Sequence, residues 1–180
     1  MLTAAGVPFE SVTPVGDEEA AKASLAGLAP AALAEALAAF KAEGVSERQP
    51  DALVLGSDSV VALADGARLD KPGARLAEQL RQLSGRTHEL HSAAVVCEGG
   101  RPVWRCVETA RLTVRPLSEA FIADYVAAEG AAAGGCVGGY RMEGPGVQLF
   151  EAVEGSHFAI LGLPLVPLLG FLRTRGVLAS

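Results

Sequence analysis

Cysteine is scarce in this sequence, and its few copies form no recognisable pattern. Cys97, Cys106 and Cys136 are an odd number, and their spacing matches neither a zinc site nor a disulfide framework. The chain also shows no signal peptide. These absences argue against a disulfide-stabilised secreted domain and predict a protein of the reducing cytoplasm.

Positive charge and long apolar runs are also scarce. The 15 lysines and arginines are outnumbered by 21 aspartates and glutamates, which gives a formal net charge of -6. We therefore expect no nucleic-acid partner, and any anionic ligand must be held by cations placed close to it. The longest apolar run, residues 158–172, is interrupted by prolines and is shorter than the ~20 residues of a spanning helix, so we expect no membrane association.

The sequence does contain enough apolar material for one domain. Half of its 180 residues are hydrophobic, and a chain of this length buries about 70% of the surface that it exposes when unfolded. Periodicity and capping predict helices over residues 17–26, 31–42, 73–83, 118–128 and 164–175, and strands over 9–15, 53–63, 67–69, 89–97, 103–114, 147–152 and 157–161. Helices that alternate with strands and hairpins predict an α/β fold with a mixed sheet flanked by helices.

Asp58 is the most informative single residue, because it lies inside an apolar strand. An unpaired carboxylate there would cost several kcal/mol, so Asp58 needs a cation, a metal or hydrogen-bond donors. Turn amides around Gly56 and Ser57 are an alternative source of donors. Lys71 follows the hairpin that begins with Asp58, and its ammonium could lie near that carboxylate and suit a phosphate, although a lysine beside a proline is usually solvated.

Other charged residues have ordinary structural explanations from sequence alone. Asp17 and Glu18 stand at a helix start, and Lys41 stands near a helix end, where the helix dipole favours charges of these signs. Glu143 lies in a glycine-rich segment and could be a surface turn residue. No pattern of nucleophile and base is visible, so nucleophilic catalysis is not supported.

Nine short motifs, in order along nearly the whole chain, resemble the Maf family of nucleoside triphosphate pyrophosphatases. They are Gly-Val-Pro-Phe-Glu at 6–10, Asp-Glu at 17–18, Leu-Val-Leu-Gly-Ser-Asp-Ser-Val-Val at 53–61, Asp-Lys-Pro at 70–72, Leu-Ser-Gly-Arg-Thr-His at 83–88, Arg-Pro-Leu-Ser at 115–118, Gly-Gly-Tyr at 138–140, Glu-Gly-Pro-Gly at 143–146 and Gly-Leu-Pro-Leu at 162–165. A single motif of this kind would be weak, whereas nine in order make coincidence improbable.

The resemblance implies a fold similar to that of Maf proteins and inosine triphosphatases, and hydrolysis of a nucleotide between its alpha and beta phosphates. By position, Asp58 would be the catalytic carboxylate and Glu18 a second acidic group, and both would bind a divalent cation, Mg or Mn. Lys41 and Lys71 would neutralise the phosphates of the nucleoside triphosphate. The resemblance also implies a homodimer.

Base preference is expected to depend on Glu143. A glutamate there resembles the branch of the family that favours a guanine-type nucleotide such as 7-methyl-GTP, whereas a glutamine is typical of the branch that favours dTTP and UTP. Ser59 departs from both branches, which usually carry Gln or Thr at that position.

The chain begins inside a helix that other family members precede with a strand and a Ser-x-Ser-x-Arg-Arg loop. The resemblance therefore predicts a single Maf-like domain, residues 1–180, that is incomplete at its N-terminus. Because those arginines would grip phosphate oxygens, the alternative function is a catalytically impaired relic that binds a nucleotide or a partner.

Overall fold

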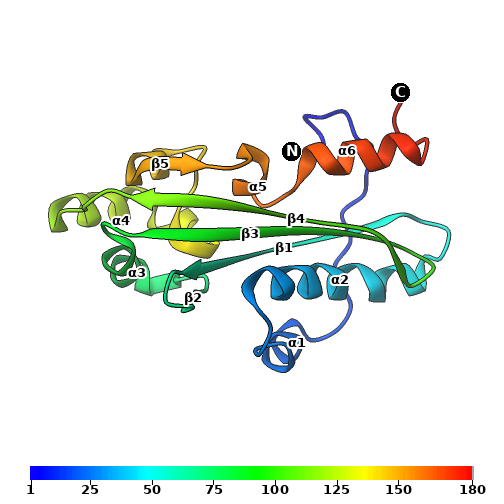
Figure 1. Cartoon of the computed structure of the whole chain (residues 1–180), viewed down its shortest axis with the longest axis horizontal. Helices are drawn as coiled ribbons and strands as arrows, with labels where there is room; N and C mark the ends of the chain where they lie inside the picture. Colours follow the sequence, from blue (N-terminus) through cyan, green and yellow to red (C-terminus); the bar gives the residue numbers. More distant parts are fainter. Residues whose placement is uncertain (180) are drawn as a thin grey trace.

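The computed structural model describes residues 1–179, whose centre is a twisted sheet of five strands (Figure 1). The strands lie in the order β2-β1-β3-β4-β5. Their bounds are Val54–Leu63 for β1, Arg68–Leu69 for β2, Thr87–Glu98 for β3, Arg101–Val114 for β4 and Phe150–Glu154 for β5. The long β3 and β4 form the middle of the sheet, and β1 lies against β3.

All four strand pairings are antiparallel. Gly99 and Gly100 turn the chain between β3 and β4 with φ of 56° and 75°, a backbone conformation that favours glycine, so the strands predicted over 89–97 and 103–114 form a hairpin. The predicted α/β fold with helices flanking the sheet is confirmed as well. The parallel pairing that a mixed sheet implies does not occur within residues 1–179, because two of the neighbouring pairs are hairpins and β3 returns alongside β1 in the opposite direction.

Six α-helices surround the sheet. They are α1 (Glu18–Ser24), α2 (Pro30–Arg48), α3 (Leu76–Leu83), α4 (Glu119–Ala133), α5 (His157–Ile160) and α6 (Leu165–Thr174). Figure 1 shows α2 along one face of the sheet and α6 along the other. Successive residues of β3 alternate between the two faces, because Ala93, Val95 and Cys97 pack in the α2 cluster whereas Ala94 and Val96 pack in the α6 cluster.

The close approach of α2 to β1 depends on Gly56. A methyl group at this position would collide with the backbone carbonyl of Ala38 in α2. This contact sets how near the helix comes to the strand, and therefore how near a side chain of α2 comes to Asp58, two residues further along β1. Pro30 occupies the first turn of α2, where a proline is tolerated because its missing N–H would have no partner within the helix.

Several sequence predictions of local structure are wrong. The chain does not begin inside a helix, because residues 2–6 form turns, and α4 continues past residue 128 to Ala133. The helix α2 does not end at residue 42 but continues through Gly44 to Arg48, because Val45 and Ser46 are buried and tertiary packing outweighs the cost of one glycine. Residues 9–15 form no strand, since no strand pairs with them.

Two further wrong predictions concern the C-terminal part of the chain. Residues 157–161 were expected to be a strand, but Ser156 accepts a hydrogen bond from the Ala159 N–H and starts the helix α5. Residues 145–149 form a short 3-10 helix, so β5 begins at Phe150. No helix within residues 1–179 is both long and apolar enough to cross a membrane.

Candidate active site

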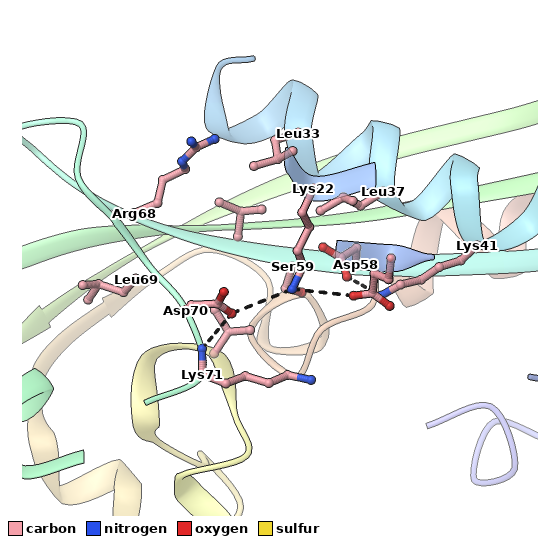
Figure 2. Close-up of a pocket in the computed structure, with 13 residues that line it drawn as sticks. Lys22, Leu33, Leu37, Lys41, Asp58, Ser59, Arg68, Leu69, Asp70 and Lys71 are labelled. Carbon is pink, nitrogen blue, oxygen red and sulfur yellow. Dashed lines mark hydrogen bonds and ion pairs between the residues drawn. The ribbon is translucent and has the colours of Figure 1, made fainter. Parts of the chain in front are cut away.

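A cavity of about 240 Å³ lies between α1, α2, β1 and the segment that follows β2. We call it the charged pocket. Its charged lining residues are Glu18, Lys22, Lys41, Asp58, Arg68, Asp70 and Lys71. The chain contains only three lysines, and all three line this pocket. Figure 2 shows Lys22, Lys41 and Asp58 converging from two helices and one strand, with Asp70 and Lys71 on the facing segment.

The open edge of β1 makes room for this pocket. The strand β2 is two residues long and pairs with β1 only at Val61 and Ala62. Asp58 therefore lies on a stretch of β1 that has β3 on one side and no strand on the other. A short edge strand thus leaves a stretch of the sheet edge free to line a cavity.

Asp58 is paired with a cation, as a carboxylate in an apolar strand requires. Its side chain is 13% exposed, and its Oδ1 lies 2.5 Å from the Nζ of Lys41. The same ammonium lies 3.5 Å from Oε1 of Glu18. Lys41 thus bridges the two carboxylates, and this pairing takes the place of the turn amides that were the alternative explanation of Asp58.

Burial raises the pKa of Asp58, although the hydrogen bond and the charge of Lys41 oppose this shift. A carboxylate with a raised pKa is a stronger base than an ordinary aspartate. Asp58 is therefore suited to accept a proton while it remains close to a cation.

Lys22 belongs to this site and was missed by the sequence reasoning. Its ammonium lies 3.7 Å from Glu18 and 3.9 Å from Asp70, so it connects α1 to the segment after β2. Burial lowers its pKa, but the attraction of Asp70 and Glu18 outweighs burial, and the net effect raises the pKa of Lys22. The signal that could have found it is the i,i+4 spacing from Glu18, which places both side chains on one helix face.

Lys71 lines the charged pocket together with Asp58, but the two residues form no ion pair. Its backbone N–H donates to the Asp70 carboxylate. Within residues 1–179 the Lys71 ammonium has no carboxylate partner. This ammonium is consequently available for an anionic ligand.

Glu143 lies outside the charged pocket, in an adjoining cavity of about 210 Å³. We call this cavity the second pocket. Its lining includes Leu90, Tyr140, Glu143, Ile160, Leu161 and Gly162. Ser59 and Val137 line both pockets. The structure therefore separates the predicted site residues into two groups, four in the charged pocket and Glu143 in its neighbour.

Asp58 and Glu18 fit a divalent cation that arrives with phosphate oxygens. Within residues 1–179 there is no group of three or more His, Cys, Asp or Glu side chains placed to hold a metal alone. Mg²⁺ characteristically uses one or two carboxylates together with phosphate oxygens and water, rather than a cage made only of protein ligands. The donor set of the pocket suits that mode of binding.

Comparison with known proteins shows the family of this chain. The family model described as Maf-like protein matches residues 1–175. The chain belongs to the Maf family. It is 48% identical to a protein of Sphingopyxis alaskensis, over 98% of this chain and 91% of that protein, and 48% identical to one of Caulobacter vibrioides, over 99% and 90%. A protein of Hyphomonas neptunium is 47% identical over 100% of this chain and 92% of its own length. All three relatives are named nucleoside triphosphate pyrophosphatase.

Membership of the Maf family confirms the resemblance that the nine motifs indicated. Asp58 and Lys71, which belong to two of the motifs, line one cavity because the hairpin of β1 and β2 connects their segments. The contribution of Lys22 and Asp70 comes from the structure, since neither had been assigned a role.

Proposed function

We propose that this protein hydrolyses a nucleoside triphosphate between its alpha and beta phosphates, releasing a nucleoside monophosphate and pyrophosphate. The observation that carries the proposal is the charged pocket, where all three lysines of the chain surround a carboxylate whose pKa is raised by burial. The names of the Maf relatives support the same reaction.

The lysines supply the positive charge that a triphosphate requires. The three lysines and Arg68 outnumber the three carboxylates that line this cavity, so its lining carries net positive charge in a protein of net charge -6. Lys71 has no carboxylate partner within the described residues and is free to contact a phosphate oxygen. Lys41 and Lys22 already neutralise Glu18, so they would share their charge between that carboxylate and the ligand. Phosphoryl transfer depends mainly on such positioning and charge neutralisation.

Asp58 would act as the general base. The oxygen of a water molecule forms a bond to the alpha phosphorus, the bond from that phosphorus to the bridging oxygen breaks, and pyrophosphate leaves with the bonding electron pair. The Asp58 carboxylate takes the proton that the attacking water loses, and Lys41 holds the carboxylate in place through its hydrogen bond. Asp58 and Glu18 would also hold Mg or Mn, which when bound neutralises negative charge on the phosphates.

The nucleobase of the substrate would lie in the second pocket, beside Glu143. A carboxylate can accept hydrogen bonds from both N1–H and the exocyclic amino group of guanine, whereas dTTP and UTP present a single N–H between two carbonyl groups. We therefore propose a guanine-type nucleotide, 7-methyl-GTP included, as the preferred substrate. The proximity of Glu143 to the charged pocket, through the shared residues Ser59 and Val137, supports this placement.

The proposal extends to a homodimer in the cytoplasm without nucleic-acid or membrane partners. The family resemblance supports the dimer, and the unpatterned cysteines support the cytoplasm. The acidic composition argues against a nucleic-acid partner, and the lack of a helix within residues 1–179 that could cross a membrane argues against a membrane partner. Light scattering of the purified protein would give the mass of the particle.

A substrate panel tests the reaction and the nucleobase preference together. The purified protein is incubated with GTP, 7-methyl-GTP, dTTP and UTP, with Mg, with Mn or with EDTA, and products are separated by ion-exchange chromatography. We expect monophosphate and pyrophosphate in equal amounts, and loss of turnover in EDTA. Diphosphate and orthophosphate as products would contradict the proposed reaction. Faster turnover of dTTP or UTP would contradict the proposed preference for a guanine-type nucleotide. Nucleotide binding without turnover would indicate the impaired relic.

A further inference from the structure

Ser59 occupies the junction between the charged pocket and the second pocket. Only two residues line both cavities, Ser59 and Val137, and Ser59 alone of the two carries a polar side chain. If phosphates occupy one pocket and a base the other, as proposed above, the sugar that joins them must pass this junction. Ser59 is therefore the side chain best placed to contact the sugar.

The hydrogen bonds around Ser59 fix the direction of its hydroxyl. Its Oγ lies 2.8 Å from the Oγ of Ser92, which is fully buried on β3. The Ser92 hydroxyl donates to the backbone carbonyl of Ala159 at 2.7 Å, and a carbonyl oxygen can only accept. Because a hydroxyl has one proton, Ser92 has none left for Ser59, so Ser59 must be the donor in the contact between the two serines.

This relay leaves Ser59 with lone pairs and no proton to offer a ligand. Its Oγ can accept a hydrogen bond from a hydroxyl or an amino group, but it cannot donate one to a phosphate oxygen. A phosphate at this point would face an oxygen lone pair, which is repulsive. The residue therefore favours a donor group at the junction and keeps the phosphates in the charged pocket.

The backbone of Ser59 faces the uncovered edge of β1. Leu63 donates its N–H to Ala67, so the odd-numbered residues of β1 direct their backbone groups toward the β2 side of the strand. β2 pairs with β1 only at Val61 and Ala62, and at Ser59 no described strand covers that side. Gly162 also lies beside the hydroxyl, and a methyl group there would be 3.6 Å from Oγ, so the absence of a side chain leaves the oxygen accessible.

We propose that Ser59 accepts a hydrogen bond from a sugar hydroxyl of the bound nucleotide and so selects the sugar. This inference rests on the proposed nucleotide site, and it adds a specificity residue that acts separately from Asp58 and Glu143. Ser59 contributes to binding and takes no part in proton transfer.

Binding measurements test this without relying on turnover. The probes are guanosine 5′-(α,β-methylene)triphosphate, which resists cleavage at the reacting bond, and its 2′-deoxy and 3′-deoxy counterparts, each titrated calorimetrically into the purified protein. The wild type should bind the parent compound about three to ten times more tightly than one of the deoxy compounds, the range expected for one hydrogen bond. The deoxy compound that binds more weakly identifies which sugar hydroxyl contacts Ser59, and we call this difference the affinity ratio. In Ser59→Ala this ratio should fall to about one, through weaker binding of the parent compound alone.

Ser57→Ala is the matched control. Ser57 lies two residues away on the same face of β1, its hydroxyl donates to Gly162, and it lines neither of the two pockets. The ratio in this variant should equal that of the wild type. Equal binding of all three probes by the wild type, or an unchanged ratio in Ser59→Ala, would overturn the inference.

Turnover of GTP, measured in parallel, separates this inference from the proposed function. If the wild type releases pyrophosphate and the affinity ratio is unchanged in Ser59→Ala, only the role of Ser59 is overturned and the proposed reaction stands. If the affinity ratio falls to about one in Ser59→Ala but the wild type releases no pyrophosphate, the role of Ser59 is supported and the proposed reaction is contradicted. No binding of any probe would overturn both.

Discussion

The charged pocket and the second pocket adjoin the same stretch of β1, yet they differ in chemistry. Asp58 and Ser59 are neighbours on this strand, and the alternation of side chains directs Asp58 toward Lys41 of α2 and Ser59 toward Ser92 of β3. The charged pocket gathers all three lysines, whereas the second pocket is lined mainly by apolar side chains, with Arg141 and Glu143 as its charged residues. The contrast suggests that reaction and selection are performed by different groups of residues, so variants should affect one without the other.

The largest effect is expected at the reacting end. Asp58→Asn removes the charge of the proposed base and keeps its shape, so kcat should fall by about 10²- to 10⁴-fold while the far-UV circular dichroism stays the same. Because burial raises the pKa of Asp58, wild-type kcat should increase with pH as this carboxyl ionises, at higher pH than for an ordinary aspartate. Asp124→Asn, an exposed residue of α4, is the control. A wild-type kcat in Asp58→Asn would mean that another group activates water.

The next effect is expected at His88, behind the lining of the second pocket, and is measured as a change in the free energy of unfolding. His88 is 1% exposed, its Nε2 lies 2.8 Å from the Tyr140 hydroxyl, and Tyr140 lines that pocket. Burial lowers the pKa of His88 from 6.5 to about 4. Below pH 6.5 the unfolded chain binds a proton that the folded protein does not bind until about pH 4, so the stabilisation is complete above pH 6.5 and is lost as the pH falls through this window.

The expected loss from this one group is about 3 kcal/mol in the free energy of unfolding. Urea denaturation of the wild type and of His88→Phe at several pH values between 7 and 4 measures it, and the variant should lack this part of the pH dependence. His157→Gln changes an exposed histidine and should keep it. Identical pH profiles of the wild type and His88→Phe would contradict the prediction.

A smaller effect is expected at Lys71, which sharpens the contrast between paired and free cations. Lys71→Gln removes a charge-assisted contact to phosphate and should lower kcat/KM by about tenfold or more. Since no carboxylate of the described chain pairs with this ammonium, the free energy of unfolding should change by less than about 0.5 kcal/mol. Steady-state kinetics and urea denaturation measure the two quantities, with the exposed Arg173→Gln of α6 as control. Large destabilisation without a change in kcat/KM would assign Lys71 to the fold.

The smallest effect is expected at Glu143, where a variant should change the nucleobase preference and not the reaction itself. Glu143→Gln should shift the ratio of kcat/KM for GTP against UTP by about tenfold toward UTP, because a glutamine amide can donate as well as accept. Glu151→Gln, an exposed residue of β5, should leave the ratio unchanged. An equal fall in kcat for every nucleotide would place Glu143 in the reaction, and would remove the proposed division of labour between the two pockets.

Local structure was predictable where the determining contacts lie within a few residues. Asp17 caps α1 by accepting from the N–H groups of Glu19 and Ala20, and two glycines turn the hairpin between β3 and β4. The stripe of Leu76, Leu80 and Leu83 in α3 is fully buried, as its spacing predicts. The need of Asp58 for a polar partner also followed from its strand alone, because burying an unpaired charge is costly wherever it occurs.

The identity of that partner and the division into two pockets were decided only by tertiary structure. Lys41 reaches Asp58 because α2 packs against Gly56, and Lys22 reaches Asp70 across about 50 residues of chain because α1 lies beside the segment after β2. Ser59 lost its free proton to a relay that joins β1, β3 and α5. Propensity and periodicity describe neighbours along the chain, whereas these contacts depend on how helices and strands pack, which involves burial energies larger than any local preference.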